Sequence, residues 1–286
     1  SRIALDALEA GKHVFCEKTL AKGYNGVREL VAKAKQSKNI FQTGHQYHSS
    51  RLYTHVVDLI KEGQVGNIIA FEAQWNRHGN WRRPVPKPQY EKAINWRMYR
   101  EFSGGLTAEL GSHQIDFVNW VLDDTPNQVM GIGGVDYWKD GRETYDNVHL
   151  IYSYPSGVKA NFSYLTNNAK DGYQIKVSGD KGTIIIDMKN AWFYPEGKTE
   201  DKILGDVDGV SGATVQWDKE KGYKINVEHL NPTEQTLIDF RDAILNNKQP
   251  KSNVITGAKT AICVQMGLDA MYKNEIIRWN SGVLNS

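Results

Sequence analysis

The sequence predicts an α/β and α+β fold: the C-terminal part of a Rossmann-type doubly wound domain, followed by a large, mainly antiparallel open sheet with helices on one face. Two short apolar segments, 13–16 and 40–43, flank a helical pattern, which is the strand–helix–strand unit of a parallel sheet. From residue 68 onward, segments with alternating apolar and polar residues follow one another, as in antiparallel sheets with one solvated face. We therefore expect one domain at 1–46 and a second at 47–286.

The first part ends in two polar loops that should lie side by side. One apolar segment runs directly into Glu17 and Lys18, and the other is followed by His45 and Gln46. The carboxyl ends of parallel strands meet at one edge of the sheet, where such folds bind their ligands. These four residues are therefore candidates for a ligand-binding edge.

The second part alternates a few helices with many strands. Glycines and prolines separate the periodic segments, and two of the connections have the composition of hairpin turns. A glycine- and aspartate-rich stretch at 197–212 is expected to be a loop. We expect helices at 52–62, 103–124, 233–246 and 254–272, with the last packing back on the first part, and strands at 68–76, 128–139, 147–154, 158–166, 173–178 and 183–187.

The helix at 103–124 carries ionisable residues on the edge of its apolar face. At about 100° per residue, Glu109, His113, Asp116 and Trp120 share one narrow stripe beside the core-facing residues. A carboxylate one turn from an imidazole can tune a proton-transfer group. The same spacing also suits an ordinary salt-bridged pair on a helix surface, and spacing alone leaves both interpretations open.

The stretch at 77–102 is rich in arginine, tryptophan and proline. A connection of this length within a compact domain is usually functional or disordered, and its aromatic content argues against disorder. We interpret it as a segment that covers a substrate, although a solvated surface remains the alternative. The candidate substrate contacts are Trp81, Arg82, Trp96 and Arg97, together with Tyr47 and Asp116.

The composition excludes several classes of partner. A formal net charge of +2 gives no field that would favour nucleic acid, and no apolar run reaches the ~18 residues of a membrane span. Two cysteines far apart in the sequence exclude a disulfide framework. Eight tryptophans and fourteen tyrosines suit stacking on sugar faces. The compartment stays open between the cytoplasm and a periplasm.

Three motifs, ordered along the chain, carry a family resemblance. The run Ala10-Gly11-Lys12-His13-Val14 leads into Glu17-Lys18, Gly104-Gly105 precedes Glu109, Gly111, His113 and Asp116, and Gly179-Asp180-Lys181-Gly182-Thr183 forms a hairpin signature. Together they resemble the AGKHV…EKP segment, the GG…D-x-G-x-H-x-x-D helix and the C-terminal hairpin of the glucose–fructose oxidoreductase, inositol dehydrogenase and MocA (Gfo/Idh/MocA) family.

The resemblance implies an oxidoreductase that uses NAD or NADP on a secondary hydroxyl of a sugar, glycoside or cyclitol. It implies His113 as the acid/base, Lys18 as the cation that holds the substrate oxygen, and Glu109 as the group that orients or stabilises His113. Glu17, Lys18, His45 and Gln46 would contact the cofactor, and no metal is expected. The second domain would bind the carbohydrate and form a homo-oligomer through the open face of its sheet.

Two residues depart from the family pattern, and one motif is missing. Thr19 stands where the family has proline, and Glu109 stands where it has aspartate. The G-x-G-x-x-G fingerprint of dinucleotide binding does not occur; Gly131-Ile132-Gly133-Gly134 lacks the strand-to-helix setting and is interpreted as a strand. We therefore expect the sequence to be part of a longer protein whose main cofactor-binding residues lie elsewhere.

Three alternatives remain open at the level of sequence. The enzyme could retain its NAD and process a glycoside through a transient keto-sugar, with no net turnover of NADH. The chain could be a carbohydrate-binding or assembly module without catalysis. A metal site built from His45, His48, Glu109 and His113 is compatible with the helix spacing of the last two residues.

Overall fold

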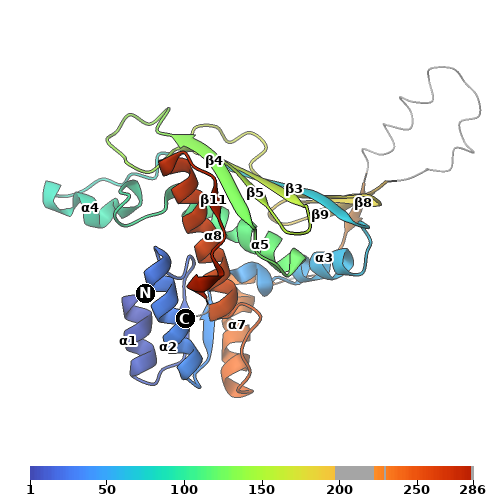
Figure 1. Ribbon diagram of the computed structural model, residues 1–286, viewed down its shortest axis with the longest axis horizontal. Helices are drawn as coiled ribbons and strands as arrows, with labels where there is room; N and C mark the ends of the chain where they lie inside the picture. The colour runs from blue at the N-terminus through green and yellow to red at the C-terminus, as the bar shows by residue number, and fades with distance from the viewer. Residues whose placement is uncertain (197–221, 229, 285–286) are drawn as a thin grey trace, which may run out of the picture.

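The computed structural model describes residues 1–196, 222–228 and 230–284, and the expected loop at 197–212 lies outside the described residues. Figure 1 shows a large sheet with helices beneath it and a smaller unit that contains the N-terminal helices. This arrangement confirms the predicted fold class, a Rossmann-type fragment joined to an open sheet. Within the described ranges, no helix is both long and apolar enough to cross a bilayer.

The N-terminal unit is half of a doubly wound sheet. Its elements are α1 (Arg2–Glu9), β1 (Val14–Cys16), α2 (Tyr24–Gln36) and β2 (Phe41–Thr43). The two strands are parallel, with Cys16 opposite Thr43, and the backbone N–H of Gly44 donates to the carbonyl of Cys16 at 2.8 Å. The loops that follow them therefore start side by side, as the sequence predicts.

The large sheet has nine strands in the order β10-β9-β8-β7-β3-β6-β5-β4-β11. The central strand β3 (Ile68–Asn76) runs parallel to β6, and the other neighbouring pairs are antiparallel. Alternate residues along much of β3, β5, β6, β7 and β8 are buried, because one face packs against helices. The remaining strands are β4 (Gln128–Gly134), β5 (Asn147–Ser153), β6 (Lys159–Leu165), β7 (Tyr173–Gly179), β8 (Gly182–Ile186), β9 (Ala191–Pro195), β10 (Tyr223–Ile225) and β11 (Ile277–Arg278).

The helices of the second part include α3, α5, α7 and α8. Ser50 caps the first of these, and Asn253 caps the last by accepting from the N–H groups of Ile255 and Thr256. Their bounds, with those of the shorter helices, are η1 (Gln46–His48), α3 (Arg51–Lys61), η2 (Pro88–Tyr90), α4 (Glu91–Ile94), η3 (Trp96–Met98), η4 (Thr107–Gly111), α5 (Ser112–Leu122), α7 (Pro232–Leu245), α8 (Val254–Lys273) and η6 (Ser281–Val283).

Helix α8 packs on both parts of the molecule. It contacts α2 and β2 of the first part and α5 and β4 of the second, and Figure 1 shows it running from the sheet down to the N-terminal unit. Tyr24 of α2 donates to Asp269 of α8 at 3.2 Å. Gly257 allows the approach, because a Cβ there would lie 2.4 Å from the side chain of Thr43. The two sheets therefore share one helix.

The other face of the sheet is not covered by any described helix. It carries a shallow hollow of ≈ 670 Å³ lined by residues of β3, β4, β5, β6 and β7. Apolar side chains stand on this face with much of their surface in water, among them Met130, Ile132 and Ile151. A sheet face of this kind is a candidate for contact with another protein surface.

Two predicted elements differ from the structure. Strand β4 ends at Gly134 instead of 139, because the carboxylate of Asp146 accepts the backbone N–H groups of Asp136, Tyr137 and Trp138 and turns the chain. The stretch at 77–102, predicted to be irregular, contains the short helices η2, α4 and η3.

The central helix is also more complex than the sequence indicates. Its first turn, Thr107–Gly111, is π-helical and precedes α5. At Gly111 the backbone lies against the ring of Tyr164, so that a Cβ would be 2.7 Å from the ring. Glycine is needed at this position because a side chain would meet the ring of Tyr164. Its backbone conformation does not require glycine, since a φ of −61° suits any residue.

We expect Gly111→Ala to lower the free energy of unfolding by about 1–3 kcal/mol, the usual cost of overpacking a core. Gly79→Ala is the matched control, because a Cβ there meets nothing closer than Trp81 at 3.9 Å. Urea unfolding of both variants measures the difference. Equal stability of the two variants would contradict the packing role of Gly111.

Candidate active site

Lys18 connects the first part of the molecule to the π-helical turn of the second. Its Nζ donates to the carbonyl of Glu109 at 2.8 Å and to that of Ala108 at 3.5 Å, and the hydroxyl of Thr19 also donates to Ala108. Burial lowers the pKa of Lys18, while the carboxylates of Glu109 and Glu17 oppose that change. Two acceptors leave the ammonium group one further N–H to offer.

His113 lies one turn after that contact, in a nearly closed aromatic setting. Its side chain is packed among the rings of His45, Tyr47 and Trp75, with centroid distances of 5.9, 5.2 and 6.0 Å. The Nδ1 atom is buried and has no hydrogen-bond partner among the described residues. Burial lowers the pKa of His113 well below its usual value, and the charges of Lys18 and His45 lower it further. The imidazole is therefore neutral near pH 7 and can accept a proton.

Glu109 pairs with Arg97, a contact that the spacing did not indicate. Its Oε2 accepts from the Nε of Arg97 at 2.9 Å, and no contact joins its carboxylate to His113. The expected contact between Glu109 and His113 is therefore absent, and the partner of Glu109 is Arg97. The physical reason is the π-helical turn: it changes the angular step per residue, so that a spacing of four no longer stacks two side chains.

A cavity of ≈ 550 Å³ opens next to His113. Three of the predicted substrate residues, Trp81, Arg82 and Arg97, line it together with Glu109. Trp96 does not line this cavity. It lies under the guanidinium of Arg97, with the Arg97 Cζ 4.2 Å from its ring centroid, and faces a second hollow of ≈ 310 Å³ that Glu17 and Lys18 also line. The two hollows share Glu109.

Several residues of the larger cavity were not among the predicted site residues. They are Trp75, Arg77, Arg83 and Leu110. Trp75 lies in the predicted strand at 68–76, and Arg77 and Arg83 were not singled out, although both arginines belong to the same arginine-rich stretch. The alternation of β3 was the available signal, because it places Trp75 on the buried face, towards α5.

Tyr47 and Asp116 do not line the cavity, contrary to the prediction. Tyr47 is stacked on Tyr53, with ring centroids 4.1 Å apart, and lies against His113 from within the core. Asp116 is 2 % exposed and lies 2.9 Å from the Nε2 of His48, while Thr260 donates to its other oxygen. Tyr47 and Asp116 therefore contact His113 and His48, respectively, from the protein interior and do not face the cavity.

The pKa of Asp116 follows from this buried contact. Burial alone would raise it, but the imidazoles of His45 and His48 and the hydrogen bond from Thr260 together lower it to about 2. His48 is held in place by stacking on Trp120 at 4.2 Å.

The predicted cofactor residues lie at the edge of the two parallel strands. Glu17 and Lys18 follow β1, and His45 and Gln46 follow β2. His45 is fully buried and faces His113, its Nδ1 lies 3.3 Å from the hydroxyl of Thr43, and its Nε2 has no partner among the described residues. Glu17 and Lys18 line the hollow of ≈ 310 Å³ at this edge, whereas His45 and Gln46 line neither that hollow nor the cavity at His113. The polar groups of Glu17 and Lys18 fit the amide and ribose at the ring end of a dinucleotide.

The alternative metal site is not supported. His48 is turned towards Asp116 and Glu109 towards Arg97, so these two do not join His45 and His113. In the ranges that the structure describes, no three histidine, cysteine or acidic side chains are grouped to hold an ion.

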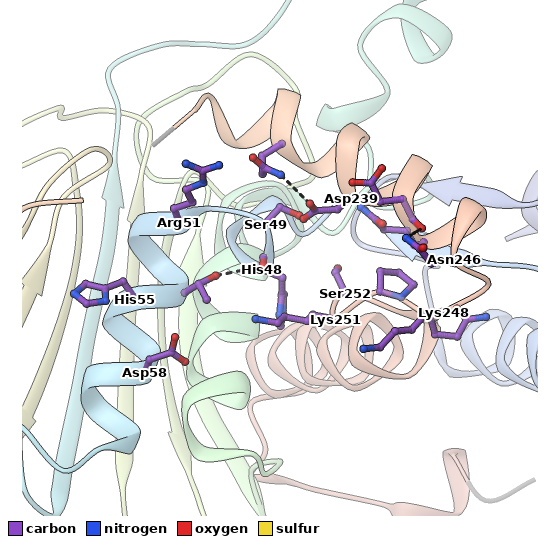
Figure 2. A pocket seen from close by; sticks show the side chains of 17 residues that line it. His48, Ser49, Arg51, His55, Asp58, Asp239, Asn246, Lys248, Lys251 and Ser252 are labelled. Atoms are coloured by element: carbon purple, nitrogen blue, oxygen red, sulfur yellow. Dashed lines mark hydrogen bonds between the residues drawn. The ribbon is translucent and has the colours of Figure 1, made fainter. Parts of the chain in front are cut away.

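Another hollow, of ≈ 630 Å³, lies between α3, α7 and the segment 248–252 (Figure 2). Its wall carries charges of both signs, including Arg51, Lys251, Asp58 and Asp239. None of Lys18, Glu109 and His113 lines it. It is somewhat larger than the cavity at His113, but the histidine that lines it nearest the parallel strands, His48, is paired with Asp116. The cavity at His113 is therefore the candidate active site.

Two family profiles match the chain. Residues 1–45 match a profile described as the oxidoreductase family with an NAD-binding Rossmann fold, and residues 53–185 match the GFO/IDH/MocA C-terminal domain. The class is thus that of oxidoreductases with a Rossmann fold followed by an open-sheet domain. Within that class, the chain belongs to the Gfo/Idh/MocA family, as the motifs predicted.

Curated relatives include enzymes that act on sugars. The chain is 31% identical over 185 residues to 1,5-anhydro-D-fructose reductase of Ensifer adhaerens, a match of 63% of this chain and 51% of the relative. It is 27% identical over 187 residues to 2,7-anhydro-N-acetylneuraminate hydratase of Escherichia coli, a match of 65% of this chain and 48% of the relative. The chain therefore spans about half the length of these curated relatives.

Solved structures share the fold. The aldose-aldose oxidoreductase from Caulobacter crescentus complexed with glycerol superposes with a TM-score of 0.76 at 18% identity, covering 97% of this chain and 75% of that one. An inositol dehydrogenase homolog from Azotobacter vinelandii complexed with NAD+ gives 0.75 at 16% identity, covering 97% and 75%. At these identities the likeness establishes the fold alone.

We expect Asp116→Asn to lower the free energy of unfolding by about 2–4 kcal/mol near pH 7, because it leaves His48 and Thr260 without a buried carboxylate. A depressed pKa stabilises the fold above the unfolded value of about 4, and this contribution is lost as the pH falls towards 2. Urea unfolding at several pH values should show the two proteins converging below about pH 4. A gap that does not change with pH would contradict this origin.

Proposed function

We propose that the protein is an NAD(P)-dependent oxidoreductase that acts on a secondary hydroxyl of a sugar, glycoside or cyclitol. One observation carries the proposal: an ammonium group from the nucleotide-binding edge bonds to the helix turn immediately before a buried, neutral imidazole. That imidazole lines a cavity whose aromatic wall suits a sugar ring.

The chemistry follows from the residue types. Oxidation of a carbinol removes a proton from oxygen and a hydride from carbon; bound NAD(P)+ supplies the hydride acceptor. His113 takes the proton, since it is neutral and a lone pair on its ring can face the cavity. Lys18 lines the adjoining hollow, and its charge is close enough to His113 to lower the pKa of that imidazole. A substrate oxygen held where the two hollows meet, beside Glu109, would be stabilised by the remaining N–H of Lys18 as negative charge develops on it.

The other predicted residues have supporting roles in this proposal. Glu17, His45 and Gln46 would contact the nicotinamide end of the cofactor, at the edge of β1 and β2. Tyr47 and Asp116 hold His113 and His48 by packing and pairing. Glu109 fixes the guanidinium of Arg97 at the mouth of the site.

A variant of this function retains the cofactor and works through a transient keto-sugar. It is favoured by the relative described as a hydratase, an activity with no net redox change. Accumulation of NADH with substrate separates net oxidation from this variant. A non-catalytic carbohydrate-binding module would not need a buried histidine without a partner, and this cost argues against it.

We expect His113→Asn to lower kcat by at least about 100-fold in the protein at its natural length, because proton transfer loses its acceptor. His55→Asn, on the exposed side of α3, is the matched control and should keep full activity. Turnover is followed by the absorbance of reduced nicotinamide, and circular dichroism verifies folding. Normal activity of the folded His113 variant would remove the catalytic assignment.

We also propose that the open face of the sheet joins two copies of the chain. Apolar side chains on this face lie opposite the helix layer, and Ile132 exposes 68% of its surface. Burying a contiguous apolar patch against a second copy removes it from water at about 25 cal/mol per Å².

Ile132→Lys should therefore shift the solution mass towards the monomer, because it places a charge in the buried contact. Ile3→Lys is the control, since Ile3 is 86% exposed on α1, outside the sheet. Light scattering after size exclusion measures the mass. An unchanged mass in the first variant, or an equal shift in both, would contradict an interface on this face.

A further inference from the structure

The cavity at His113 carries an excess of positive charge. Four of the residues that line it are arginines, and Glu109 is the one carboxylate in the lining. The whole chain has a formal net charge of only +2, so the excess is local. Lysine does not contribute to this lining, and the guanidinium group differs from an ammonium group in its planar fork of donors.

Two of the four arginines are neutralised by acidic neighbours. Arg97 pairs with Glu109, and Arg82 pairs with Glu91 and with Asp140. These two arginines are therefore part of the framework of the pocket. Their charges add little to the field inside it.

The other two, Arg77 and Arg83, have no acidic partner among the described residues. The Cζ of Arg77 lies 5.2 Å from the ring centroid of Trp75, which itself lies against His113. Arg83 is held by its backbone, which exchanges hydrogen bonds with the side chain of Asn95 at 2.7 and 3.0 Å. The guanidinium of Arg77 is thus positioned by Trp75 and the main chain of Arg83 by Asn95, while both arginine side chains are exposed at the cavity and carry no acidic partner among the described residues.

Two unpaired guanidinium groups in one cavity repel each other, and water screens them less as the cavity is filled. An anion bound between them removes that cost and forms charge-assisted, bidentate hydrogen bonds. A neutral sugar would leave both charges uncompensated in a partly dehydrated pocket, which is unfavourable.

We propose that the substrate of this site is a carbohydrate with an anionic group, and that Arg77 and Arg83 bind that group. This inference rests on the proposed function for the identity of the reacting centre. The anionic group is bound at the arginines, while a hydroxyl elsewhere on the ring reaches His113. Trp75 and Trp81 supply the aromatic surface between the two ends.

The anionic group can be a carboxylate, a phosphate ester or a sulfate ester, since all three accept the arginine fork. A matched panel of sugars distinguishes them: D-glucuronate and N-acetylneuraminate for carboxylates, D-glucose 6-phosphate and D-glucose 6-sulfate for the esters, and D-glucose and methyl glucoside as neutral counterparts. Binding is measured by calorimetry, without turnover, on the protein at its natural length.

We expect at least one anionic sugar to bind about 10-fold or more tightly than its neutral counterpart, and its affinity to fall with added salt. Arg77→Gln and Arg83→Gln should each weaken that ligand by about 10- to 100-fold while changing neutral sugars by less than about 2-fold. Arg28→Gln on the exposed side of α2 removes the same charge outside the cavity and should have no effect.

The proposal is overturned if no anionic sugar binds at concentrations up to about 10 mM, if neutral and anionic sugars bind equally, or if Arg28→Gln has the same effect as the cavity variants. These results are independent of redox activity. Selective anion binding without reduction of nicotinamide by any sugar would contradict the proposed function alone. Oxidation of neutral sugars only would contradict the anionic substrate alone.

Discussion

The proposed site depends on the hydrogen bond between the Lys18 ammonium and the backbone carbonyl of Glu109. This bond crosses from the parallel-strand edge to the helix that carries His113, so it holds the two parts of the proposed site together. The acceptors are backbone atoms, whose position does not depend on any side-chain rotamer. A charged donor makes such a bond stronger than a neutral one. The cost is partial desolvation of the ammonium group, which lowers its pKa.

The surroundings of His113 keep it neutral and in place. Aromatic rings from η1 and β3 exclude water from one side, while Lys18 and His45 disfavour a second positive charge beside them. Asp116 compensates a different histidine, His48, in a layer behind the site. His48 thus has a carboxylate partner, whereas the Nδ1 of His113 has no hydrogen-bond partner among the described residues, which distinguishes the structural histidine from the proposed reactive one.

The sequence predicted the architecture, and the fold brings two candidate reactive groups, Lys18 and His113, close enough for the charge of the first to lower the pKa of the second. Strand periodicity and the motif Glu17-Lys18 were sufficient for the two sheets and the ligand edge, because burial patterns and strand-end topology are local properties. The partner of Glu109 and the position of Tyr47 could not be predicted. The first depends on a π-helical turn that ideal helical spacing does not describe, and the second on which rings pack into the core.

The excess positive charge of the cavity could not be predicted either, because it also depends on contacts that form only in the folded protein. Arginines in the stretch at 77–102 look alike in the sequence, but Glu91 and Asp140 approach only one of them, and Asp140 lies beyond the central helix in the chain. Which guanidinium groups stay free is therefore a property of the folded loops. Composition could indicate a binding surface, but it could not indicate the sign of its field.

Helix α8 shows that the boundary between the two parts in the sequence is not a boundary in space. It lies near the C-terminus, yet it packs on α2 and β2 as well as on α5 and β4. If residues 1–46 were removed, part of the surface of α8 would face water instead of the N-terminal unit. This part includes Gly257, which approaches Thr43, and Asp269, which accepts a hydrogen bond from Tyr24. The unit that can be exchanged between related proteins without exposing a packed surface is consequently both sheets together with α8. Neither sheet alone is such a unit.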